Sequence, residues 1–378
     1  MSDRPIRLAV VGLKQGLEDV YIALHDAGYE LVAVCDREYE PYQWITGEVR
    51  FEDSEQEYAR YPHLVPMMRA IREHPDAGSV RFFDDYERML SERDVEAVAI
   101  MVPDALHAPF SLAALEAGKW VLCTKPMADS IPAAWEIVRA AEANENRYLM
   151  SLPFAFGPMA RITLELIANG EIGKPRLVRL DHFRGQFRPV FRRKEVTHGP
   201  VVAEGCHYVH MISLFAGAFD GKDPRFDRVA GFAGLDVHVD TQDIDDNGQV
   251  MIEFDNGVRG SHAYSYFSRV PAPQPLMILG EEGLLAGGQK RVTVYPHGCE
   301  PRSVDLEGDR DFPHSHHVGY ARMYKHWQRV IREGESAMTH ARAAFENLIT
   351  VHAAQRAVDE GVVICREPWL AEHEASDR

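Results

Sequence analysis

Apolar runs and helical segments alternate along the first 125 residues of the chain. The continuous apolar runs, which predict strands buried on both faces, lie at 6–11, 30–35, 95–102 and 119–125. Helix-forming stretches separate these runs, and two of them end at Gly28 and Gly118. Strands without polar alternation, joined by helices, favour a parallel sheet that is covered by helices on both faces. The pattern therefore predicts a doubly wound α/β domain.

The pattern changes after residue 127. Helices are predicted at 131–144, at 158–168, near 318–333 and near 341–359. The segments between them are β-rich or alternate in polarity, and they read RLVRLDHF, RVAGFAG, NGQVMIEF, VRGSHAYSYF, PLMILG and RVTVYP. Turn signals such as Asn256-Gly257 and Gly283 separate these segments, which is typical of antiparallel strands. We therefore predict a domain boundary at 127, followed by an α+β domain (128–378) with a large, mainly antiparallel sheet.

Length and charge narrow the classes of function. A chain of 378 residues accommodates two domains. Its net charge of −17 disfavours nucleic acid and anionic membranes as partners, and no apolar window approaches the length of a membrane span. The N-terminal apolar run leads into a glycine turn, unlike a secretory signal. The five cysteines are widely spaced and odd in number, so we expect no disulfide framework and a cytoplasmic location.

The first strand ends at a glycine turn that is typical of dinucleotide binding. Gly12, Leu13, Lys14 and Gly16 would form this turn, and the following helix would offer its N-terminal N–H groups to a pyrophosphate. The glycine pattern is incomplete, because Lys14 stands at the second glycine position and Gly16 is displaced by one from the third. A turn that binds no cofactor therefore stays open as the alternative.

The second strand ends at an acidic residue, which supports the same interpretation. Asp36 follows Gly12 by 24 residues and would accept hydrogen bonds from the adenosine ribose. This carboxylate disfavours a 2′-phosphate, so NAD is expected as the cofactor. Arg37 would accommodate such a phosphate, which keeps NADP open. The polar and aromatic stretch near 38–80 is interpreted as a surface insertion, with a lid or interface over the cofactor as the alternative.

Residues 95–128 carry the most specific pattern and read VEAVAIMVPDALHAPFSLAALEAGKWVLCTKPMA. This segment resembles the glucose–fructose oxidoreductase / inositol dehydrogenase / MocA (Gfo/Idh/MocA) family. The matching positions are Pro103, His107, Ala117-Gly118-Lys119 and Lys125-Pro126, whereas Thr124 replaces the usual glutamate. The segments GEIGKPRLVR (170–179), EGCHYVH (204–210) and DNGQVMIEFDNGVRG (246–260) resemble the family as well. The resemblance therefore spans nearly the whole chain.

The resemblance implies hydride transfer between nicotinamide and a secondary hydroxyl of a sugar, inositol or related polyol. Lys125 would contact both cofactor and substrate and would stabilise the developing alkoxide, and His207 would act as general base. Pro103 and His107 would line the nicotinamide side. The two catalytic groups would converge on one carbinol. The alternatives are a solvated lysine and a satisfied core histidine. The resemblance also implies a homodimer or homotetramer, formed through the sheet of the second domain.

The histidine segment departs from the family pattern. Where relatives carry an acid four residues before the histidine and another three residues after it, this chain has Ala203 and His210. Glu204 stands one position from the first of these sites. In a helix Glu204, His207 and His210 would share a face, so Glu204 would orient His207 and His210 would contact substrate. Loss of the usual acid leaves an altered reaction open.

Further candidates surround this segment. Phe154, together with Phe156 and Tyr208, would stack on a sugar ring or belong to the core. Arg184 begins a basic segment that continues with Arg188, Arg192 and Arg193. This segment is interpreted as a solvated loop, with a flap that recognises an acidic or phosphorylated substrate as the alternative. The run His314-Ser315-His316-His317 suggests a metal, but metal sites need a fixed ligand geometry, and we expect none.

Two other functions stay open on the same scaffold. NAD-dependent transient oxidation followed by elimination would cleave glycosides without accumulation of NADH. A ligand-sensing regulator would bind the cofactor but turn over no sugar, and the incomplete glycine turn and Ala203 favour it slightly.

Overall fold

The computed structural model describes residues 4–53, 64–187, 189–272, 275–288, 290–306 and 315–375. The chain divides into two compact units, of which the first comprises Met1–Ser151 and Ala321–Ala344. The second unit comprises Leu152–Tyr320 and Phe345–Arg378. The boundaries near the C-terminus fall inside the helices α11 (Ser315–Glu333) and α12 (Ala341–Glu360). No described helix is long and apolar enough to cross a membrane.

The first unit is built on a six-stranded sheet in the order β3-β2-β1-β4-β5-β6. Its strands are β1 (Ile6–Val11), β2 (Tyr29–Cys35), β3 (Arg81–Phe83), β4 (Ala97–Ile100), β5 (Trp120–Thr124) and β6 (Tyr148–Ser151). All neighbouring strands pair in parallel. The strand order reverses beside β1, and in such sheets ligands bind at this point, outside the carboxyl ends of the strands. The predicted doubly wound sheet is confirmed.

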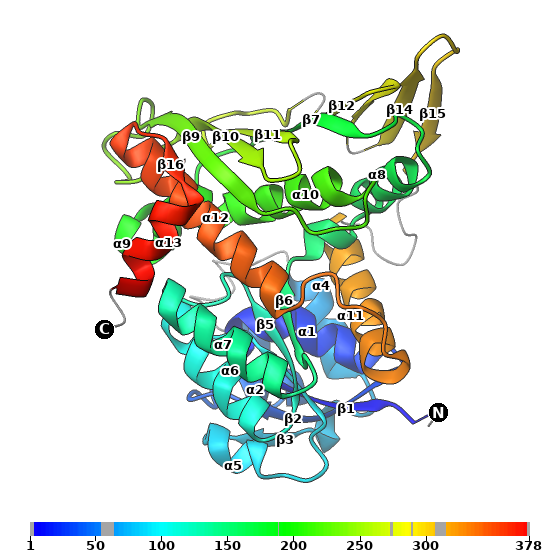
Figure 1. Cartoon of the computed structure of the whole chain (residues 1–378). Helices are drawn as coiled ribbons and strands as arrows, with labels where there is room; N and C mark the ends of the chain where they lie inside the picture. The colour runs from blue at the N-terminus through cyan, green and yellow to red at the C-terminus, as the bar shows by residue number, and fades with distance from the viewer. Residues whose placement is uncertain are drawn as a thin grey trace. The chain divides into compact units, whose positions relative to one another are not determined.

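Helices cover both faces of this parallel sheet, which explains why its strands are apolar throughout. They are α1 (Leu13–His25), α2 (Glu40–Thr46), α4 (Val65–Glu73), α5 (Tyr86–Leu90), α6 (His107–Glu116) and α7 (Ile131–Ala143). Figure 1 shows α6 and α7 side by side on the sheet. The unit extends beyond 127, where the sequence analysis placed a boundary, because β6 pairs with β5 as the sixth strand.

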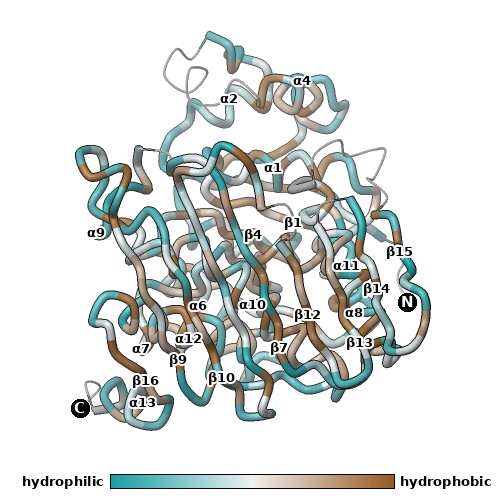
Figure 2. The backbone as a smooth tube through the Cα atoms, turned by 90° about the horizontal axis from the view of Figure 1, so that it is seen from above, coloured by the Kyte–Doolittle hydropathy of each residue, from teal (hydrophilic) through white to brown (hydrophobic). Residues whose placement is uncertain are grey.

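The second unit contains a ten-stranded, mainly antiparallel sheet, as predicted. The strands are β7 (Pro175–Leu180), β8 (His182–Phe183), β9 (Phe226–Gly234), β10 (Asn247–Phe254), β11 (Arg259–Ser265), β12 (Leu276–Gly280), β13 (Gly283–Gly287), β14 (Arg291–Pro296), β15 (Arg302–Asp305) and β16 (Ile364–Cys365). Among the described strands of this second sheet, only the pairings of β11 with β7 and β8 are parallel. Along β10, buried Val250 and Ile252 alternate with exposed Gln249 and Met251. Figure 2 colours the backbone of this sheet by hydropathy.

The helices of this unit lie beside the sheet. They are α8 (Pro158–Ala168), α9 (Lys194–Thr197), α10 (Cys206–Gly217), α13 (Arg366–Ala375) and the part of α12 from Phe345 onward, with a π-helical turn at Val201–Gly205. Short 3-10 turns occur at Pro153–Phe156 and Pro189–Arg192. Helix α10 packs on β7 and β11, so the side chains at its N-terminus lie near the ends of these strands.

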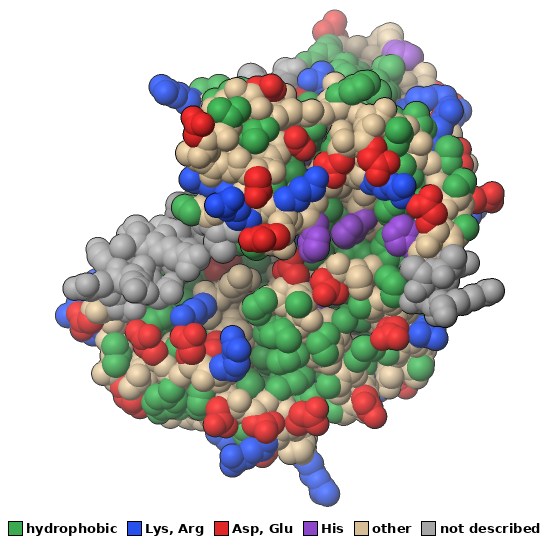
Figure 3. Space-filling view, turned by 90° about the vertical axis from the view of Figure 1, so that its left-hand side faces the viewer, with side chains coloured by type: hydrophobic (Ala, Val, Ile, Leu, Met, Phe, Trp, Pro, Cys, Tyr) green, Lys and Arg blue, Asp and Glu red, His purple; other side chains and the backbone are tan. Residues whose placement is uncertain are grey.

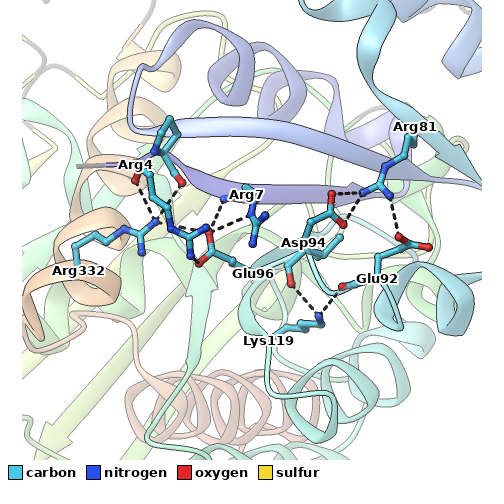
Figure 4. Close-up of polar contacts among 10 residues, drawn as sticks. Arg4, Arg7, Arg81, Glu92, Asp94, Glu96, Lys119 and Arg332 are labelled. Carbon is cyan, nitrogen blue, oxygen red and sulfur yellow. Dashed lines mark hydrogen bonds and ion pairs between the residues drawn. The ribbon is translucent and has the colours of Figure 1, made fainter. Parts of the chain in front are cut away.

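Lys119, from the Ala-Gly-Lys motif, has a structural role in the first unit. Its Nζ donates to the backbone oxygens of Glu92 at 3.0 Å and Val95 at 2.8 Å, and the side chain is buried (Figure 4). Burial lowers the pKa of this lysine. Figure 4 also shows the nearby ionic groups, which are Arg4, Arg7, Arg81, Glu92, Asp94, Glu96 and Arg332. Lys119 therefore links the loop before β4, at Glu92 and Val95, to the start of β5 through two hydrogen bonds.

We expect Lys119→Met to lower the free energy of unfolding by about 1–3 kcal/mol, because two carbonyls lose their buried donor. NAD affinity of the folded protein should stay unchanged. The urea unfolding midpoint measures the loss. Lys194→Met is the control, because Lys194 is exposed and pairs with Asp359 at 2.8 Å. Its effect should stay below about 1 kcal/mol. Equal effects of the two substitutions would contradict the structural role of Lys119.

Candidate active site

The glycine turn after β1 is one residue long. Gly12 adopts a left-handed conformation with φ of 84°, and α1 begins at the next residue. A Cβ atom on Gly12 would lie 2.2 Å from the carbonyl oxygen of Met101, so no larger residue fits without movement of the backbone. Gly16 lies against β1, where a Cβ atom would approach Val10 to 2.8 Å. The N-terminus of α1 therefore opens at the carboxyl edge of the sheet.

Asp36 fastens this turn from the end of β2. Its Oδ2 accepts the backbone N–H of Leu13 at 2.7 Å, and its Oδ1 accepts that of Glu38 at 3.0 Å. Glu38 forms an exposed ion pair with Lys14 at 2.8 Å, and the hydrogen bond from Lys14 lowers the pKa of Glu38. Arg37 is exposed beside them. Two carboxylates, those of Asp36 and Glu38, thus lie beside the Gly12 turn.

His107 holds the segments that follow β4 and β5. Its Nδ1 lies 2.6 Å from the carbonyl oxygen of Pro126, and its Nε2 lies 2.8 Å from that of Val102. The ring is fully buried. Each ring nitrogen of His107 thus faces one carbonyl oxygen. The structure shows that His107 connects two strand ends, and its place beside the nicotinamide stays a prediction. Lys125, directly before Pro126, is half-buried at this carboxyl edge, and Pro103 is exposed.

We expect His107→Leu to lower kcat by about 10- to 100-fold, because Lys125 then loses its fixed backbone and small displacements are costly in catalysis. His107→Asn should retain more activity, since an amide can still reach one carbonyl. Steady-state kinetics at a temperature where each variant is folded measure this. His326→Leu removes another buried imidazole of the first unit, one that contacts Glu335 at 3.1 Å instead of a strand end. Equal losses of kcat in the two leucine variants would contradict the positioning role.

In the second unit, His207 is a buried residue in the first turn of α10. Its ring lies 4.5 Å from that of Phe154, at an angle of 32°, and Phe154 comes from the 3-10 turn before α8. His210 follows on the same helix and is also buried. A half-buried aromatic ring beside an imidazole is an arrangement that can receive the apolar face of a sugar ring. The structure therefore brings Phe154, His207 and His210 into one region.

Glu204 belongs to the π-helical turn, and not to the α-helix that the sequence suggested. The wider π turn changes the spacing between Glu204 and His207, so the rule that residues three apart share a face does not apply. The Oε1 of Glu204 instead accepts a hydrogen bond from Nη1 of Arg184 at 3.2 Å. The N–H of Arg184 donates to the carbonyl of Ser265 at 2.9 Å, which anchors this arginine beside β11.

Two histidines that sequence reasoning missed stack on Tyr208 of α10. The ring of His182 stacks on Tyr208 at 4.5 Å, and Tyr208 stacks on His262 at 4.9 Å. Burial lowers the pKa of His182 to about 3 and that of His262 to about 4, so both rings are neutral near pH 7. Their signal in the sequence was their inward register in predicted strands, which does not distinguish a site from a core.

Other basic residues of the region have structural partners. Arg192 donates to the carbonyl of Phe187 at 2.7 Å, and Arg193 pairs with Asp243 at 3.5 Å. Arg188 and His314 lie outside the described residues, as do the side chains of Ser315, His316 and His317. The interpretation of these arginines as a flap therefore concerns Arg184 alone.

Figure 3 shows histidine side chains gathered on one face of the molecule. In the second unit, the rings of His198 and His352 lie 5.9 Å apart. Burial, with smaller contributions from His198 and His373, lowers the pKa of His352 to about 4. Within the described ranges, no group of three histidine, cysteine or acidic side chains is arranged to hold a metal ion.

The predicted site residues fall into both units. The first unit carries Gly12, Leu13, Lys14, Gly16, Asp36, Arg37, Pro103, His107 and Lys125, and the second carries Phe154, Arg184, Glu204, His207 and His210. Those of the first unit lie along the carboxyl edge of the parallel sheet. Those of the second unit lie around the start of α10 and the end of β8.

The parallel sheet and its glycine turn define a dinucleotide-binding fold of the Rossmann class, joined to an α+β unit. Two family models match the sequence in succession. Residues 6–152 match the oxidoreductase family with an NAD-binding Rossmann fold, and residues 164–365 match the C-terminal alpha/beta domain of the oxidoreductase family. The chain belongs to the Gfo/Idh/MocA oxidoreductase family, which confirms the resemblance.

Several characterised proteins are similar to parts of the chain. An inositol 2-dehydrogenase of Rubrobacter xylanophilus is 38% identical over 30% of this chain and 33% of its own length. The chain thus spans about a third of the length of the first curated relatives that it matches. A glycosyl hydrolase family 109 protein of Shewanella sp. (strain W3-18-1) is 22% identical over 87% of this chain and 72% of its own length.

Solved structures share the fold over nearly the whole chain. An oxidoreductase from Agrobacterium radiobacter, solved in complex with NAD+, L-tartaric acid and magnesium, gives a TM-score of 0.75 at 16% identity, covering 95% of this chain and 98% of that one. The apo scyllo-inositol dehydrogenase of Lactobacillus casei gives 0.73 at 18% identity, covering 97% and 99%. At these identities the likeness shows the fold alone.

Proposed function

We propose that the protein is an NAD-dependent dehydrogenase that transfers hydride between nicotinamide and a secondary hydroxyl of a sugar, inositol or related polyol. One observation carries the proposal. Lys125 follows β5 at the same carboxyl edge at which β1 ends in the Gly12 turn, and β4 is the strand between them. A cationic donor is thereby held at the edge where a dinucleotide binds. The names of the curated inositol dehydrogenases support the substrate class.

The residues of the first unit fit the cofactor. Gly12 leaves a position that a Cβ atom would fill, and the N-terminus of α1 presents backbone donors beside it. Leu13, Lys14 and Gly16 would complete the pyrophosphate turn. Asp36 would accept from the ribose, and the nearby carboxylate of Glu38 adds to the repulsion of a 2′-phosphate. NAD is therefore preferred to NADP, and Arg37 is the group that would weaken this preference.

Each catalytic group has one role in this proposal. Bound NAD supplies the nicotinamide that accepts or gives the hydride. Lys125 hydrogen-bonds the reacting oxygen and stabilises its developing negative charge. His207 accepts the hydroxyl proton during oxidation and returns it during reduction. Phe154 and His210 would contact the sugar in the same unit as His207.

The test is a dinucleotide-coupled screen of the wild-type protein against polyols, aldoses, glycosides and sugar acids, with NAD and NADP in parallel. We expect NADH to form with at least one neutral polyol or aldose and to form faster than NADPH. Gly12→Val should abolish NAD binding, because its side chain would meet the carbonyl of Met101. Tight NAD binding without turnover of any compound in the panel would instead support a ligand-sensing regulator.

Glycoside cleavage by transient oxidation and elimination is the second candidate. The similarity to the Shewanella glycosyl hydrolase family 109 protein extends over 87% of this chain, against 30% for the Rubrobacter dehydrogenase. This function predicts release of the aglycone from a nitrophenyl glycoside in the presence of NAD, with no accumulation of NADH. Formation of NADH in proportion to product would exclude it.

The sheet of the second unit supports a homodimer or homotetramer. Its strands carry exposed apolar side chains, among them Phe232, Met251 and Leu279. Such side chains on a sheet face are suited to contact with a second copy. Sedimentation equilibrium of the wild type and of Phe232→Glu tests this, and a dimer that survives the charged substitution would contradict the use of this face.

A further inference from the structure

The ion pair of Arg184 and Glu204 is held from two separate elements of the second unit. Arg184 follows β8 and is anchored by its N–H to Ser265, and Glu204 lies in the π-helical turn before α10. The pair is joined by a single hydrogen bond of 3.2 Å, and its side chains are 39% and 23% exposed. No other side-chain partner is seen for either group within the described part of the chain. Further donors of the guanidinium and an oxygen of the carboxylate are thus open to a ligand.

The charges of this ion pair act on a buried tyrosine hydroxyl. Tyr266 is fully buried, and its Oη has no hydrogen-bond partner among the described residues. After burial itself, the charge of Glu204 contributes most to raising the pKa of both Tyr266 and Tyr208. The Nδ1 of His182, whose ring lies 6.0 Å from that of Tyr266, likewise has no partner in the described ranges. Unsatisfied buried polar groups are unfavourable, and a ligand hydroxyl would satisfy them.

The charges of these groups cancel. Arg184 and Glu204 carry opposite charges, and the lowered pKa values keep His182 and His262 neutral near pH 7. The raised pKa values keep Tyr208 and Tyr266 protonated. An acidic or phosphorylated ligand would therefore meet the carboxylate of Glu204 without a surplus cation among these groups. A neutral ligand with hydroxyls can donate to Glu204 and accept from Arg184 at the same time.

We propose that Arg184 and Glu204 form a clamp for two neighbouring hydroxyls of an uncharged polyhydroxyl ligand, with Tyr266 as a further partner, and that Glu204 excludes sugar acids. The inference rests on the proposed function and deepens it by naming the substrate class. It also gives Glu204 a different role from the one that the sequence suggested. Glu204 here contacts the substrate directly, side by side with Arg184, whereas the prediction from the sequence made it the partner of His207.

The experiment compares D-glucose with D-glucuronate, which differ only in a hydroxymethyl or carboxylate group at the same carbon. Both are titrated into protein that is saturated with NADH, so that no hydride moves, and binding is followed by calorimetry. We expect the wild type to bind glucose at least tenfold more tightly. Glu204→Gln should reverse this preference, because Arg184 becomes an uncompensated cation. Arg184→Gln should weaken the binding of glucose at least tenfold, without any increase in the affinity for glucuronate.

Glu281→Gln is the matched control, because Glu281 pairs with Arg176 in another part of the same unit. It should leave the wild-type ratio of the two affinities unchanged. The clamp is overturned if the wild type binds glucuronate as tightly as glucose, if Glu204→Gln leaves the ratio unchanged, or if neither glucose nor myo-inositol binds. Binding of the neutral sugars without any hydride transfer would retain the clamp and refute the proposed function. Oxidation of uronates alone would retain the function and refute the clamp.

Discussion

Lys125→Met is expected to lower kcat for polyol oxidation by about a thousandfold, while NAD affinity changes by less than about twofold. The reason is that the ammonium group acts mainly on charge that develops in the transition state, where loss of one donor costs about 100- to 1000-fold. Loss of general acid–base support adds to this effect. In the proposed function NAD binds at the Gly12 turn and Asp36, and this substitution leaves their contacts in place. Single-turnover formation of NADH measures the first effect, and titration of the cofactor measures the second.

Two further variants distinguish the ammonium group from general damage to the fold. Lys125→Ala leaves a space in which methylamine can act, so added methylamine should restore part of the rate. Lys174→Met removes a lysine whose partner is Asp220, at 2.7 Å in the second unit, and should keep wild-type kcat. A Lys125→Met protein with undiminished turnover would refute the role of Lys125. A loss of rate accompanied by an equal loss of NAD affinity would assign Lys125 to cofactor binding alone.

The sequence predicted the elements whose hydrophobic pattern is long and unbroken. β1 lies where the first apolar run placed it, and α8 and α12 match their predicted helices within one residue. β3 was missed because three residues, two of them half-buried, give no periodicity. The short strand β6 has only four residues, so its parallel pairing with β5 could not be separated from the core of a following domain.

The candidate site was predictable in its residue types but not in its contacts. Spacing identified Asp36 as an acid at the end of a strand, yet no spacing rule shows that its Oδ2 accepts the N–H of Leu13. His107 belongs to a motif beside the cofactor edge, but the direction of its ring depends on two carbonyls that come from different strand ends. The helical spacing expected between Glu204 and His207 is not observed, for another reason. A π-helical turn has no sequence signature that a helical spacing rule can use.

Asp19 is a buried carboxyl group in α1 and is expected to make the stability of the first unit strongly dependent on pH. Its side chain is 1% exposed, and its Oδ1 accepts a hydrogen bond from Tyr324 at 2.7 Å. Burial raises its pKa from 3.8 to about 7, against the opposing effect of the Tyr324 hydrogen bond, and Glu18 adds to the increase. Between these pH values the folded chain holds a proton that the unfolded chain has lost.

The direction of the pH effect follows from this proton. The free energy of unfolding should be highest below pH 4 as far as this group is concerned, and should fall by about 1.4 kcal/mol per pH unit until it levels off above pH 7. A rise in pKa from 3.8 to about 7 thus corresponds to a decrease of about 4 kcal/mol in the free energy of unfolding between low and high pH. Asp19→Asn lacks this titration. The free energy of unfolding of Asp19→Asn, relative to that of the wild type, should therefore increase by up to about 4 kcal/mol between pH 4 and pH 8.

Tryptophan fluorescence can follow this unit separately, because Trp44, Trp120, Trp135 and Trp327 belong to it and only Trp369 belongs to the second. Urea unfolding in a Trp369→Phe background, repeated from pH 4 to pH 8, gives the required midpoints. Tyr324→Phe provides a second test, because loss of its hydrogen bond removes the contact that favours the ionised carboxylate. The decline in stability should then continue to a higher pH than in the wild type. Parallel pH profiles of wild type and Asp19→Asn would show that this carboxyl group is ionised in the folded protein already near pH 4, and that its burial is less complete than the contacts of α1 indicate.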